Sequence, residues 1–436
     1  NYTGPITYTV TATDNVGKSS TKEFIVKNDT ESPILSGKEE NQPPILFKNN
    51  DGDFFHHLLN AISFGKLGTE KTTIDFAVSD GKGVGFGDSS YVEVMFVPVG
   101  KKVGSDGNII KTSENGSNSV SITADDLKGT FKGTIYYKLT DDLGNPTSEW
   151  QMITSANSNI LSEDASGNDI SIVMIENIKP TITITPSSIS DESYVNSENK
   201  TIYNGDASFT VNMNDQNSGL YSYAVTINGK AQNDKEEPEL FPSEEKIQDE
   251  GKPVYEKTVS LTTENLTANE DGSFVVEVTV IDNSGNVNEE TCTVYKDTTA
   301  PVITNFEFDT EDGSGYEEGA KNAVEVIDYG FYFKKNVKVT ISANDPEVSN
   351  EITSGVQSIT YKIDGIDAKG NSYTNEETVN VQDATTSFSI EVAKGFKGQI
   401  YAFATDNVNN SGSYVHPDGT VVESLDKHSE SSSIVI

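Results

Sequence analysis

The chain contains no arginine: its 31 basic residues are all lysine, against 68 aspartates and glutamates, which gives a formal net charge of −37 at pH 7. Nucleic-acid binding needs a basic surface to neutralise phosphate, so this composition excludes it. The bidentate recognition of phosphate or carboxylate by arginine is excluded as well. A surface this acidic favours a soluble, monomeric protein, and it suits divalent cations.

Cysteine occurs once, at Cys292, so an internal disulfide bond is excluded. The alternation around it places Cys292 on the same strand face as Val294, which is typical of a buried, unreactive thiol. The sequence has no run of 18 apolar residues that could span a membrane, and it shows no signal peptide. Because the chain opens at Asn1 in the middle of a repeat, we expect it to be part of a longer secreted protein.

Signals for catalysis are also scarce. The four histidines show no metal-binding spacing such as His-Glu-x-x-His, and no serine lies in a nucleophile-elbow motif. The glycine-rich stretch 83–87 resembles a phosphate loop only superficially, because no helix is expected after it. Acidic pairs are frequent, so spacing alone does not exclude a glycosidase dyad, but most of them mark solvated loops. No set of catalytic roles can be assigned, and we predict that the chain is not an enzyme.

Repetition is what the sequence does have. An alternating apolar strand, a turn that begins with Asp and a second strand occur four times. The strands cover 6–12, 135–139, 274–280 and 400–404, and the turns begin at Asp14, Asp141, Asp282 and Asp406. A repeat of this size indicates an array of like modules. Such arrays usually span distance or bind, and less often catalyse a reaction.

Separate landmarks repeat in register. The offset from Phe131 to Phe396 and the offset from Asp80 to Asp345 are both 265 residues. Asp80, Asp215 and Asp345 each follow a strand in which every second residue is apolar, the signature of a half-buried strand. We therefore expect homologous modules.

Three acidic linkers that end in proline, 29–33, 176–180 and 297–301, separate the modules. Proline removes a ladder donor and fixes φ, which suits a strand edge at a domain entrance. We predict that 1–32 forms the last two strands of a truncated module. Complete modules then follow at 33–179, 180–300 and 301–436. The first and the last of these have long hairpins, at 148–171 and 410–432.

Several of these motifs resemble the bacterial immunoglobulin-like (Big-type) tandem repeats of cell-surface adhesins and stalk proteins. They are the linker 297–301, the Asp…Ser-Gly-Val/Leu loops at 345–356 and 215–220, and the Thr-Asp-Asn-x-Gly type of turn. The resemblance covers the whole chain and implies seven-stranded sandwiches in tandem, some of which bind Ca²⁺ at their junctions. The chain departs from the pattern at 83–85, where Ser-Gly-Val is expected, and at Glu176, which replaces the linker Asp.

Many short strands with turn signals and no helical period predict an all-β fold: tandem immunoglobulin-like β-sandwich domains in an elongated array. In such a sandwich the incoming linker, the loop after the second strand and the turn after the sixth strand share one end. This geometry predicts Ca²⁺ sites at the junctions, because Ca²⁺ takes 6–8 oxygen ligands. The three predicted ligand sets are Asp29, Asp80 and Asp141; Glu176, Asp215 and Asp282; and Asp297, Asp345 and Asp406. The alternative is that these residues only form turns, since Asp bonds its own backbone there.

The long hairpins carry Trp150, Tyr414 and His416, which are candidates for ligand binding because loops on rigid scaffolds often carry recognition. Alternatively, the hairpins fold back as edge strands. The aromatic stretches 54–57 and 329–333 are expected either in the core or on a binding surface.

Together these patterns predict a non-catalytic, extracellular bacterial protein segment, secreted or on the cell surface. It would be an adhesin stalk that presents a binding site. In an alternative reading, the modules themselves bind a host protein or a glycan through 148–171 and 410–432. A more distant alternative is an accessory part of a secreted carbohydrate-active enzyme. The expected partners are a host or cell-surface protein or a glycan, with no nucleic acid, no membrane insertion and a monomeric rod. Ca²⁺ is the expected cofactor.

Overall fold

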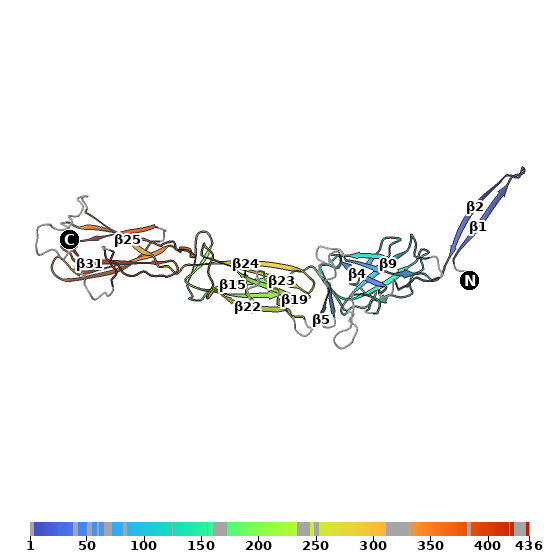
Figure 1. Cartoon of the computed structure of the whole chain (residues 1–436), viewed down its shortest axis with the longest axis horizontal. Helices are drawn as coiled ribbons and strands as arrows, with labels where there is room; N and C mark the ends of the chain where they lie inside the picture. The colour runs from blue at the N-terminus through green and yellow to red at the C-terminus, as the bar shows by residue number, and fades with distance from the viewer. Residues whose placement is uncertain are drawn as a thin grey trace.

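The computed structural model describes residues 4–37, 42–49, 55–58, 61–64, 72–81, 85–123, 125–154, 156–159, 172–232, 245–247, 253–310, 331–332, 335–381, 385–417, 419–422 and 433–435. Regular structure in these residues is β, apart from one short 3₁₀ helix at Asp125–Leu127. The strands form successive groups along one long axis, so the molecule is elongated (Figure 1). We refer to the predicted ranges 33–179, 180–300 and 301–436 as modules 1, 2 and 3.

Module 2 shows the sandwich in its simplest form. One sheet has the order β15-β18-β22, and the other has the order β16-β17-β24-β23-β19-β20, with β21 beside β19. This is the arrangement of immunoglobulin-like sandwiches, in which the first, second and fifth strands face the third, sixth and seventh. The strands are β15 (Thr181–Ser188), β16 (Ser193–Val195), β17 (Thr201–Tyr203), β18 (Ala207–Asn214), β19 (Leu220–Ile227), β20 (Lys230–Ala231), β21 (Glu245–Lys246), β22 (Glu256–Thr262), β23 (Ser273–Asp282) and β24 (Val287–Lys296).

Module 1 repeats this plan with a sheet β11-β7-β4 facing a sheet β10-β9-β12-β14-β6-β5, to which β13 adds beside β12. A further two-stranded sheet pairs β3 with β8, and its residues Leu35 and Val78 pack against the core of the module. Its strands are β3 (Ile34–Leu35), β4 (Ile45–Asn49), β5 (Phe55–Leu58), β6 (Ala61–Phe64), β7 (Thr72–Phe76), β8 (Val78–Ser79), β9 (Tyr91–Pro98), β10 (Ile109–Thr112), β11 (Ser119–Ile122), β12 (Thr130–Thr140), β13 (Gln151–Met152) and β14 (Val173–Glu176).

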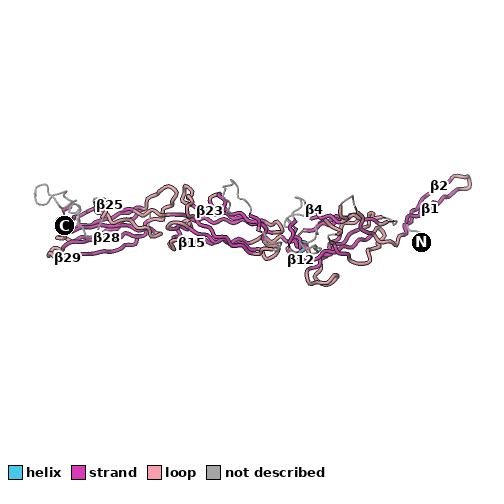
Figure 2. The backbone as a smooth tube through the Cα atoms, turned by 60° about the horizontal axis from the view of Figure 1, so that its bottom comes forward, coloured by secondary structure: helices cyan, strands magenta, loops and turns pink. Residues whose placement is uncertain are grey.

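Module 3 has a sheet β25-β27-β30 and a sheet β26-β32-β31-β28-β29. Each described sheet keeps to a single module, and the tube view in Figure 2 shows the groups of strands in succession from a second direction. The strands are β25 (Val302–Thr310), β26 (Phe331–Tyr332), β27 (Val337–Asn344), β28 (Val356–Ile366), β29 (Ser372–Asn380), β30 (Thr385–Val392), β31 (Lys397–Asp406) and β32 (Ser433–Val435). The all-β, tandem-sandwich fold predicted from the sequence is confirmed.

Each module has its own core between its two sheets. In module 2, Phe209 and Val211 point inward from β18 and are buried, while every second residue of that strand is more exposed. They share one buried core with Val276 and Val278 of β23, in the facing sheet. The period-two alternation therefore fixes which face of each strand is buried, and burial of that face holds the sandwich together.

The extra residues of modules 1 and 3 are not placed as predicted. The turns at Asp141 and Asp406 are as tight as the turn at Asp282, because in all three the N–H of the Asp bonds the carbonyl four residues later. The last strand of the sandwich is instead interrupted. In module 1, β13 pairs with the middle of β12, the chain then departs, and β14 returns to pair with the beginning of the same strand. A split last strand thus replaces the expected long hairpin.

Module 3 follows the same scheme. Ser411 and Val415 form bridges with Thr405 and Ala402 of β31, and β32 pairs with the beginning of that strand. Most of the residues between the two halves, 155 and 160–171 in module 1 and 418 and 423–432 in module 3, lie outside the described part. The same is true of 54 and of 329–330 and 333 in the two aromatic stretches, and no side chain of either stretch is described.

The first strands, β1 (Gly4–Thr13) and β2 (Ser19–Asn28), form a separate two-stranded ribbon at the N-terminal end (Figure 1). Its cross-strand partners Tyr8 and Phe24 are about half exposed, at 54% and 47%. A two-stranded ribbon lacks the opposing sheet that would cover such residues. The interpretation of 1–32 as part of a truncated module stays a prediction.

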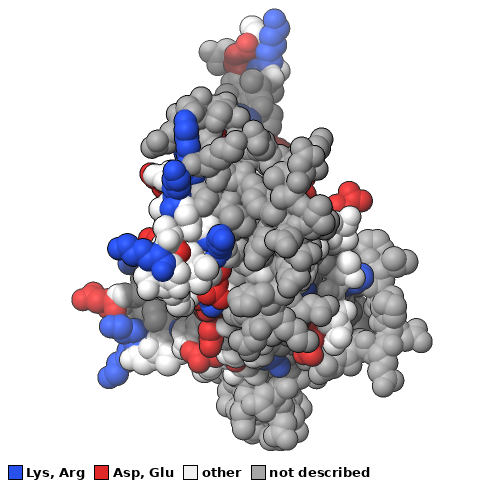
Figure 3. Space-filling model, turned by 90° about the vertical axis from the view of Figure 1, so that its left-hand side faces the viewer, with Lys and Arg blue, Asp and Glu red and all other residues white. Residues whose placement is uncertain are grey.

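The described surface carries charge of both signs. Viewed from the C-terminal end, the described surface shows lysine and acidic side chains side by side (Figure 3). No helix among the described residues has the length and apolar character needed to cross a bilayer.

Candidate metal centres at the module junctions

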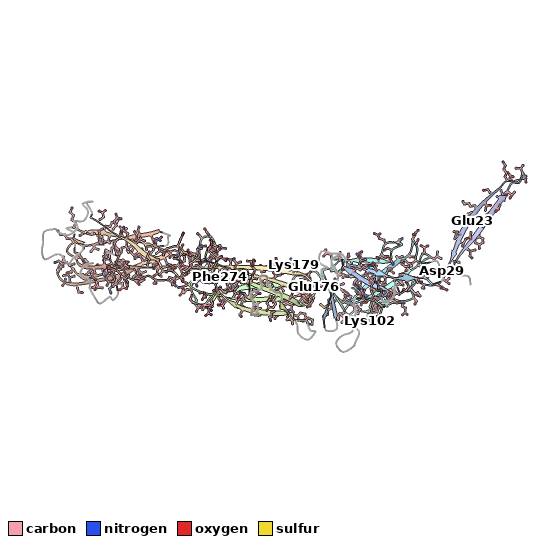
Figure 4. The ribbon with its side chains drawn as sticks, viewed as in Figure 1. Glu23, Asp29, Lys102, Glu176, Lys179 and Phe274 are labelled. Carbon is pink, nitrogen blue, oxygen red and sulfur yellow. The ribbon has the colours of Figure 1, made fainter. Side chains whose placement is uncertain are left out.

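Three groups of acidic side chains form at the entrances of the modules, and they are the three sets predicted from the sequence. In each group, ligand oxygens of the three carboxylates all lie within 4.8 Å of one another. All nine residues are buried. Figure 4 shows Asp29 at the base of the N-terminal ribbon and Glu176 between modules 1 and 2. Each group therefore stands where one part of the chain joins the next.

The strands explain why three distant residues meet. In the third group, Asp297 follows β24 of module 2, Asp345 follows β27 of module 3, and Asp406 ends β31 of module 3. The linker enters the sandwich at the end where β27 and β31 both finish, so their terminal residues converge on it. The first two groups are built from equivalent positions.

The turn residues use their carboxylates to shape the turn. One oxygen of Asp406, Oδ1, accepts the backbone N–H groups of Val408 and Asn410 at 2.9 and 2.8 Å. Asp141 and Asp282 make the same pair of bonds. The predicted turn-forming role is therefore present in the structure, as Asp turns lead one to expect.

Sequence reasoning missed an asparagine four residues after each turn Asp. The Asn410 amide donates to Oδ2 of Asp406 at 2.7 Å and to the carbonyl oxygen of the linker residue Asp297 at 3.0 Å. Asn145 and Asn286 do the same in the other two groups. These side chains tie the turn to the linker. The spacing Asp-x-x-x-Asn could have revealed these residues in the sequence. The turn at Asp14 departs from this spacing, because the residue four positions later is Lys18.

Backbone donors hold the other two carboxylates. The N–H of Gly355 donates to Oδ2 of Asp345 at 2.7 Å, and the N–H of Ser354 donates to Oδ2 of Asp297 at 2.7 Å. In the middle group, Gly219 and Ser218 donate in the same way to Asp215 and Glu176. In the first group, the N–H of Gly85 donates to Asp80 at 2.9 Å. The glycine is thus preserved even though stretch 83–85 departs from the Ser-Gly-Val pattern.

One buried oxygen in each group has no hydrogen-bond partner. These atoms are Oδ1 of Asp80, Oε2 of Glu176 and Oδ1 of Asp345. Their residues are 6%, 2% and 7% exposed. Buried polar atoms are nearly always paired, so an exception in each of the three groups, on the loop acid in two of them and on the linker acid in the middle one, calls for an explanation. A cation at the centre of each group would supply the missing partner.

The buried carboxylates also disturb one another. Two unit charges 4.8 Å apart repel by about 3 kcal/mol at the effective dielectric constant of roughly 20 that suits protein sites. Burial, together with the charges of Glu176 and Asp215, raises the pKa of Asp282 to about 8. Burial and the charge of Asp297 raise the pKa of Asp345 to about 7. Burial likewise raises the pKa of Asp406 to about 6.

A turn elsewhere in module 3 separates these effects from the turn itself. Asp367 accepts the N–H groups of Lys369 and Asn371 at 2.8 Å each, and the Asn371 amide donates to its second oxygen at 3.0 Å. This repeats the Asp406 turn in an exposed hairpin. Here the hydrogen bonds of Asn371 lower the pKa of Asp367. The turn alone therefore stabilises a carboxylate, and the raised pKa of Asp406 comes from its buried, acidic surroundings.

The raised pKa values predict how the cation-free protein responds to pH. A carboxylate whose pKa is higher in the folded state contributes stability that is complete below its unfolded pKa of about 4 and is lost as pH rises through the folded pKa. In EGTA, the free energy of unfolding should therefore fall between pH 5 and pH 8, where Asp282 and Asp345 lose their protons. Calcium binding needs the deprotonated ligands, so its stabilising effect should grow over the same range. Denaturant unfolding at several pH values, with EGTA or calcium, measures both slopes; a flat profile in EGTA would contradict the account.

The asparagines give a second prediction. Asn410→Ala should weaken binding of Ca²⁺ to the third group by about 10-fold or more, as residues that orient metal ligands usually do. The matched control is Asn371→Ala, which removes the same hydrogen bond from the exposed Asp367 turn. Calorimetric titration should show a change for the first variant and none for the second. Equal effects would mean that Asn410 supports the fold and not the cation.

The three candidate ligand-binding side chains are buried or half-buried. His416 is buried, at 3% exposure, and packs edge-on against Tyr401 at 5.7 Å between ring centres. Tyr414 is half-buried and lies against Tyr401 and Phe403, with its hydroxyl donating to Glu376 at 3.2 Å. Trp150 is half-buried. The described part of 410–422 thus packs back on its sheet, so His416 cannot meet a ligand unless this segment moves. Recognition by Trp150 and Tyr414 stays a prediction.

Comparisons with known proteins give structural neighbours only. No family model matches the chain, and no curated protein matches its sequence. Among solved structures, it is similar to the FN1–FN3 domains of chicken CNTN1, with 11% identity, 85% of this chain and 97% of that chain covered, and a TM-score of 0.20. A putative membrane anchored protein from Corynebacterium diphtheriae has 11% identity, with 99% of this chain and 96% of that chain covered, and a TM-score of 0.20. Dimeric latent PorU from Porphyromonas gingivalis has 10% identity, with 90% of this chain and 35% of that chain covered, and a TM-score of 0.18. Scores this low carry no argument, so function is argued from this chain's own residues.

Proposed function

We propose that this chain is a non-catalytic segment of an extracellular bacterial surface protein, a stalk that presents a binding site, and that Ca²⁺ ions hold its module junctions. One observation carries the proposal: a buried carboxylate triplet at each junction, with one unpaired oxygen in every triplet. Each triplet joins a linker to two loops of the following module. A cation there would fix the module to the segment before it.

The donor chemistry selects the class of cation. Every ligand offered by the triplets is a carboxylate oxygen, and hard cations such as Ca²⁺ prefer oxygen, whereas Zn²⁺ is usually held by Cys and His. A Ca²⁺ ion binds oxygens at about 2.3–2.6 Å, and the triplet oxygens all lie within 4.8 Å of one another, close enough to share one such ion. Calcium also tolerates irregular geometry with carbonyl and water ligands. We therefore favour Ca²⁺ over Mg²⁺.

The chain's own residues would do three things at such a site. The turn asparagine and the loop glycine hold two carboxylates in place, as Asn410 and Gly355 do in the third group. The linker acid, Asp297, brings in the preceding module. A cation held there would supply positive charge that offsets the repulsion among the three carboxylates. The proposed result is a junction that resists bending, which suits a stalk under load.

Small-angle scattering tests the proposed stalk. In calcium, the radius of gyration should lie well above about 22 Å, the value for a compact globule of 436 residues. It should not depend on protein concentration if the rod is monomeric. A value close to that of a compact globule would contradict the stalk. A shape unchanged by EGTA would contradict the role of the cation at the junctions.

A further inference from the structure

The two junctions between complete modules differ in one loop. In module 2, the loop runs from Asp215 to Gly219, a step of four residues. In module 3, the equivalent loop runs from Asp345 to Gly355, a step of ten. Both ends of the loop keep the same hydrogen bond, from the glycine N–H to the Asp carboxylate. Six additional residues are therefore inserted within an otherwise conserved geometry.

The longer loop reaches back onto module 2. The Asn350 amide donates to the carbonyl oxygens of Ala268 and Asn269 at 3.1 and 3.2 Å. The N–H of Ile352 donates to the carbonyl of Lys296 at 3.0 Å. These three bonds join module 3 to two separate segments of module 2, and none of them involves the carboxylate triplet.

Glu351, in the same loop, holds the linker. Its carboxylate accepts the N–H of Thr298 at 3.0 Å and the hydroxyl groups of Thr298 and Thr299, the latter at 2.8 Å. These bonds flank Asp297 without using the oxygens of its triplet. The loop 346–353 thus contacts both the linker and module 2.

Gly272 of module 2 allows this close approach. Its backbone has a φ of +77°, and a Cβ there would lie 2.5 Å from the Ile352 nitrogen and 2.6 Å from the Glu351 carbonyl carbon. Real Cβ atoms do not approach other atoms so closely, so only glycine fits. On another part of the same interface, Asn204 donates to the carbonyl of Val408 at 2.9 Å, and Asn409 donates to Glu192 at 2.6 Å. Modules 2 and 3 are therefore joined at two places besides the linker.

The junction between modules 1 and 2 is built differently. Between described residues, its hydrogen bonds all pass through the linker: Ser218 and Asn286 bind Glu176, and Asn177 binds back to Asp125 and Gly129 of module 1. Beside Glu176 there is a cleft of about 170 Å³. Its lining includes Phe131 and Met174 from module 1 and Gln216, Asn217 and Tyr255 from module 2. Among the described residues, a cleft thus lies between these two modules, whereas the other junction has direct contacts.

We propose that the loop 346–353 is a clasp that locks modules 2 and 3 into one body without any cation, so that calcium controls bending at the junction between modules 1 and 2. Only the second part, the control of bending by calcium, rests on the proposed function. With calcium at Glu176, Asp215 and Asp282, the rod is straight through this junction. Without it, the three carboxylates repel one another and the single linker permits bending.

Distances between spin labels test the clasp on the full chain. Cys292→Ala removes the single native thiol, and exposed residues Thr112, Thr210 and Lys338 provide one label site in each module. In EGTA, the distance distribution between 112 and 210 should broaden, while the distribution between 210 and 338 stays as narrow as in calcium. Broadening of both to the same degree would overturn the clasp and leave the cation's role intact. If calorimetry shows no calcium binding at all, the proposed function fails, but a narrow 210–338 distribution would still support the clasp.

Gly272→Ala should broaden the 210–338 distribution in EGTA, because the added methyl group displaces Glu351 and Ile352. The matched control is Gly229→Ala, at a φ of +72° with no atom within 4 Å of its Cβ, which adds backbone strain in module 2 without touching the interface. The double variant Asn350→Gly/Glu351→Ala removes the clasp's side-chain bonds, and glycine tolerates the left-handed φ of +65° at position 350, so this variant should have the same effect as Gly272→Ala. If the double variant stays narrow in EGTA, the loop is not what locks the modules.

Discussion

Adding EGTA to the calcium-loaded chain should lower its melting temperature by about 10 °C. A ligand that binds only the folded state, at a hundredfold excess over its Kd, stabilises that state by about 2.7 kcal/mol. For modules of this length, each kcal/mol corresponds to roughly 3–5 °C. The unpaired oxygens of Asp80, Glu176 and Asp345 indicate that each triplet has a place for such a ligand. Differential scanning calorimetry with and without EGTA measures the shift.

Two controls make this result specific. Excess calcium added after EGTA should restore the melting temperature, and Mg²⁺ at the same concentration should restore less of it, because Mg²⁺ demands near-ideal octahedral geometry and gives up its water reluctantly. A melting temperature that is identical in calcium and EGTA would mean that the nine carboxylates serve only as turn formers and linker contacts.

The effect of Asp345→Asn on the free energy of unfolding should have opposite signs in calcium and in EGTA. In calcium it removes a ligand, and the third group should lose the stabilisation of about 2.7 kcal/mol that a hundredfold excess provides. In EGTA it removes one of three buried, mutually repelling carboxylates, and burial had raised the pKa of this one to about 7. Above pH 7, the variant should therefore be more stable than the wild type without calcium and less stable with it.

The control for this variant is Asp309→Asn, which makes the same charge change at an exposed position of β25 in the same module. It should change the free energy of unfolding by less than about 0.5 kcal/mol in either condition. If Asp345→Asn destabilises module 3 equally in calcium and in EGTA, the carboxylate has a structural role that does not involve a cation.

The composition of the triplets could be predicted because it depends on features with fixed spacing. Each linker acid stands four residues before a proline, and each turn acid opens a tight turn at the end of an alternating strand. Once the strands form a sandwich, topology brings Asp297, Asp345 and Asp406 to one end. The strand pattern decides that convergence, and the structure brings the three together as predicted.

The features that were missed depend on contacts between elements, which no local pattern reports. Asn410 is an ordinary turn residue until its amide is seen to reach the Asp297 carbonyl. From the sequence, the clasp 346–353 is indistinguishable from an ordinary polar loop, because its partners, Ala268 and Lys296, belong to another module. His416 reads as an exposed hairpin residue, because the return of the split last strand to its sheet is set by long-range pairing.

A rod that is stiff between modules 2 and 3 and adjustable between modules 1 and 2 would respond to calcium at one place. The difference lies in six residues of one loop, in the contact at Gly272 and in the bonds of Asn204 and Asn409 across the same interface. Where calcium is plentiful, as outside cells, the proposed stalk would be extended along its whole length. Loss of calcium would bend it beside Glu176 and leave the last two modules aligned.

The number of calcium ions bound by the full chain tests the central claim most directly. Calorimetric titration of the decalcified protein should give three Ca²⁺ ions per chain, one for each triplet. The variants Asp80→Asn, Glu176→Gln and Asp345→Asn, each of which alters one unpaired oxygen, should each lose one of the three. Saturable binding that none of these variants changes, or no saturable binding at all, would contradict the assignment of the junction triplets as calcium sites.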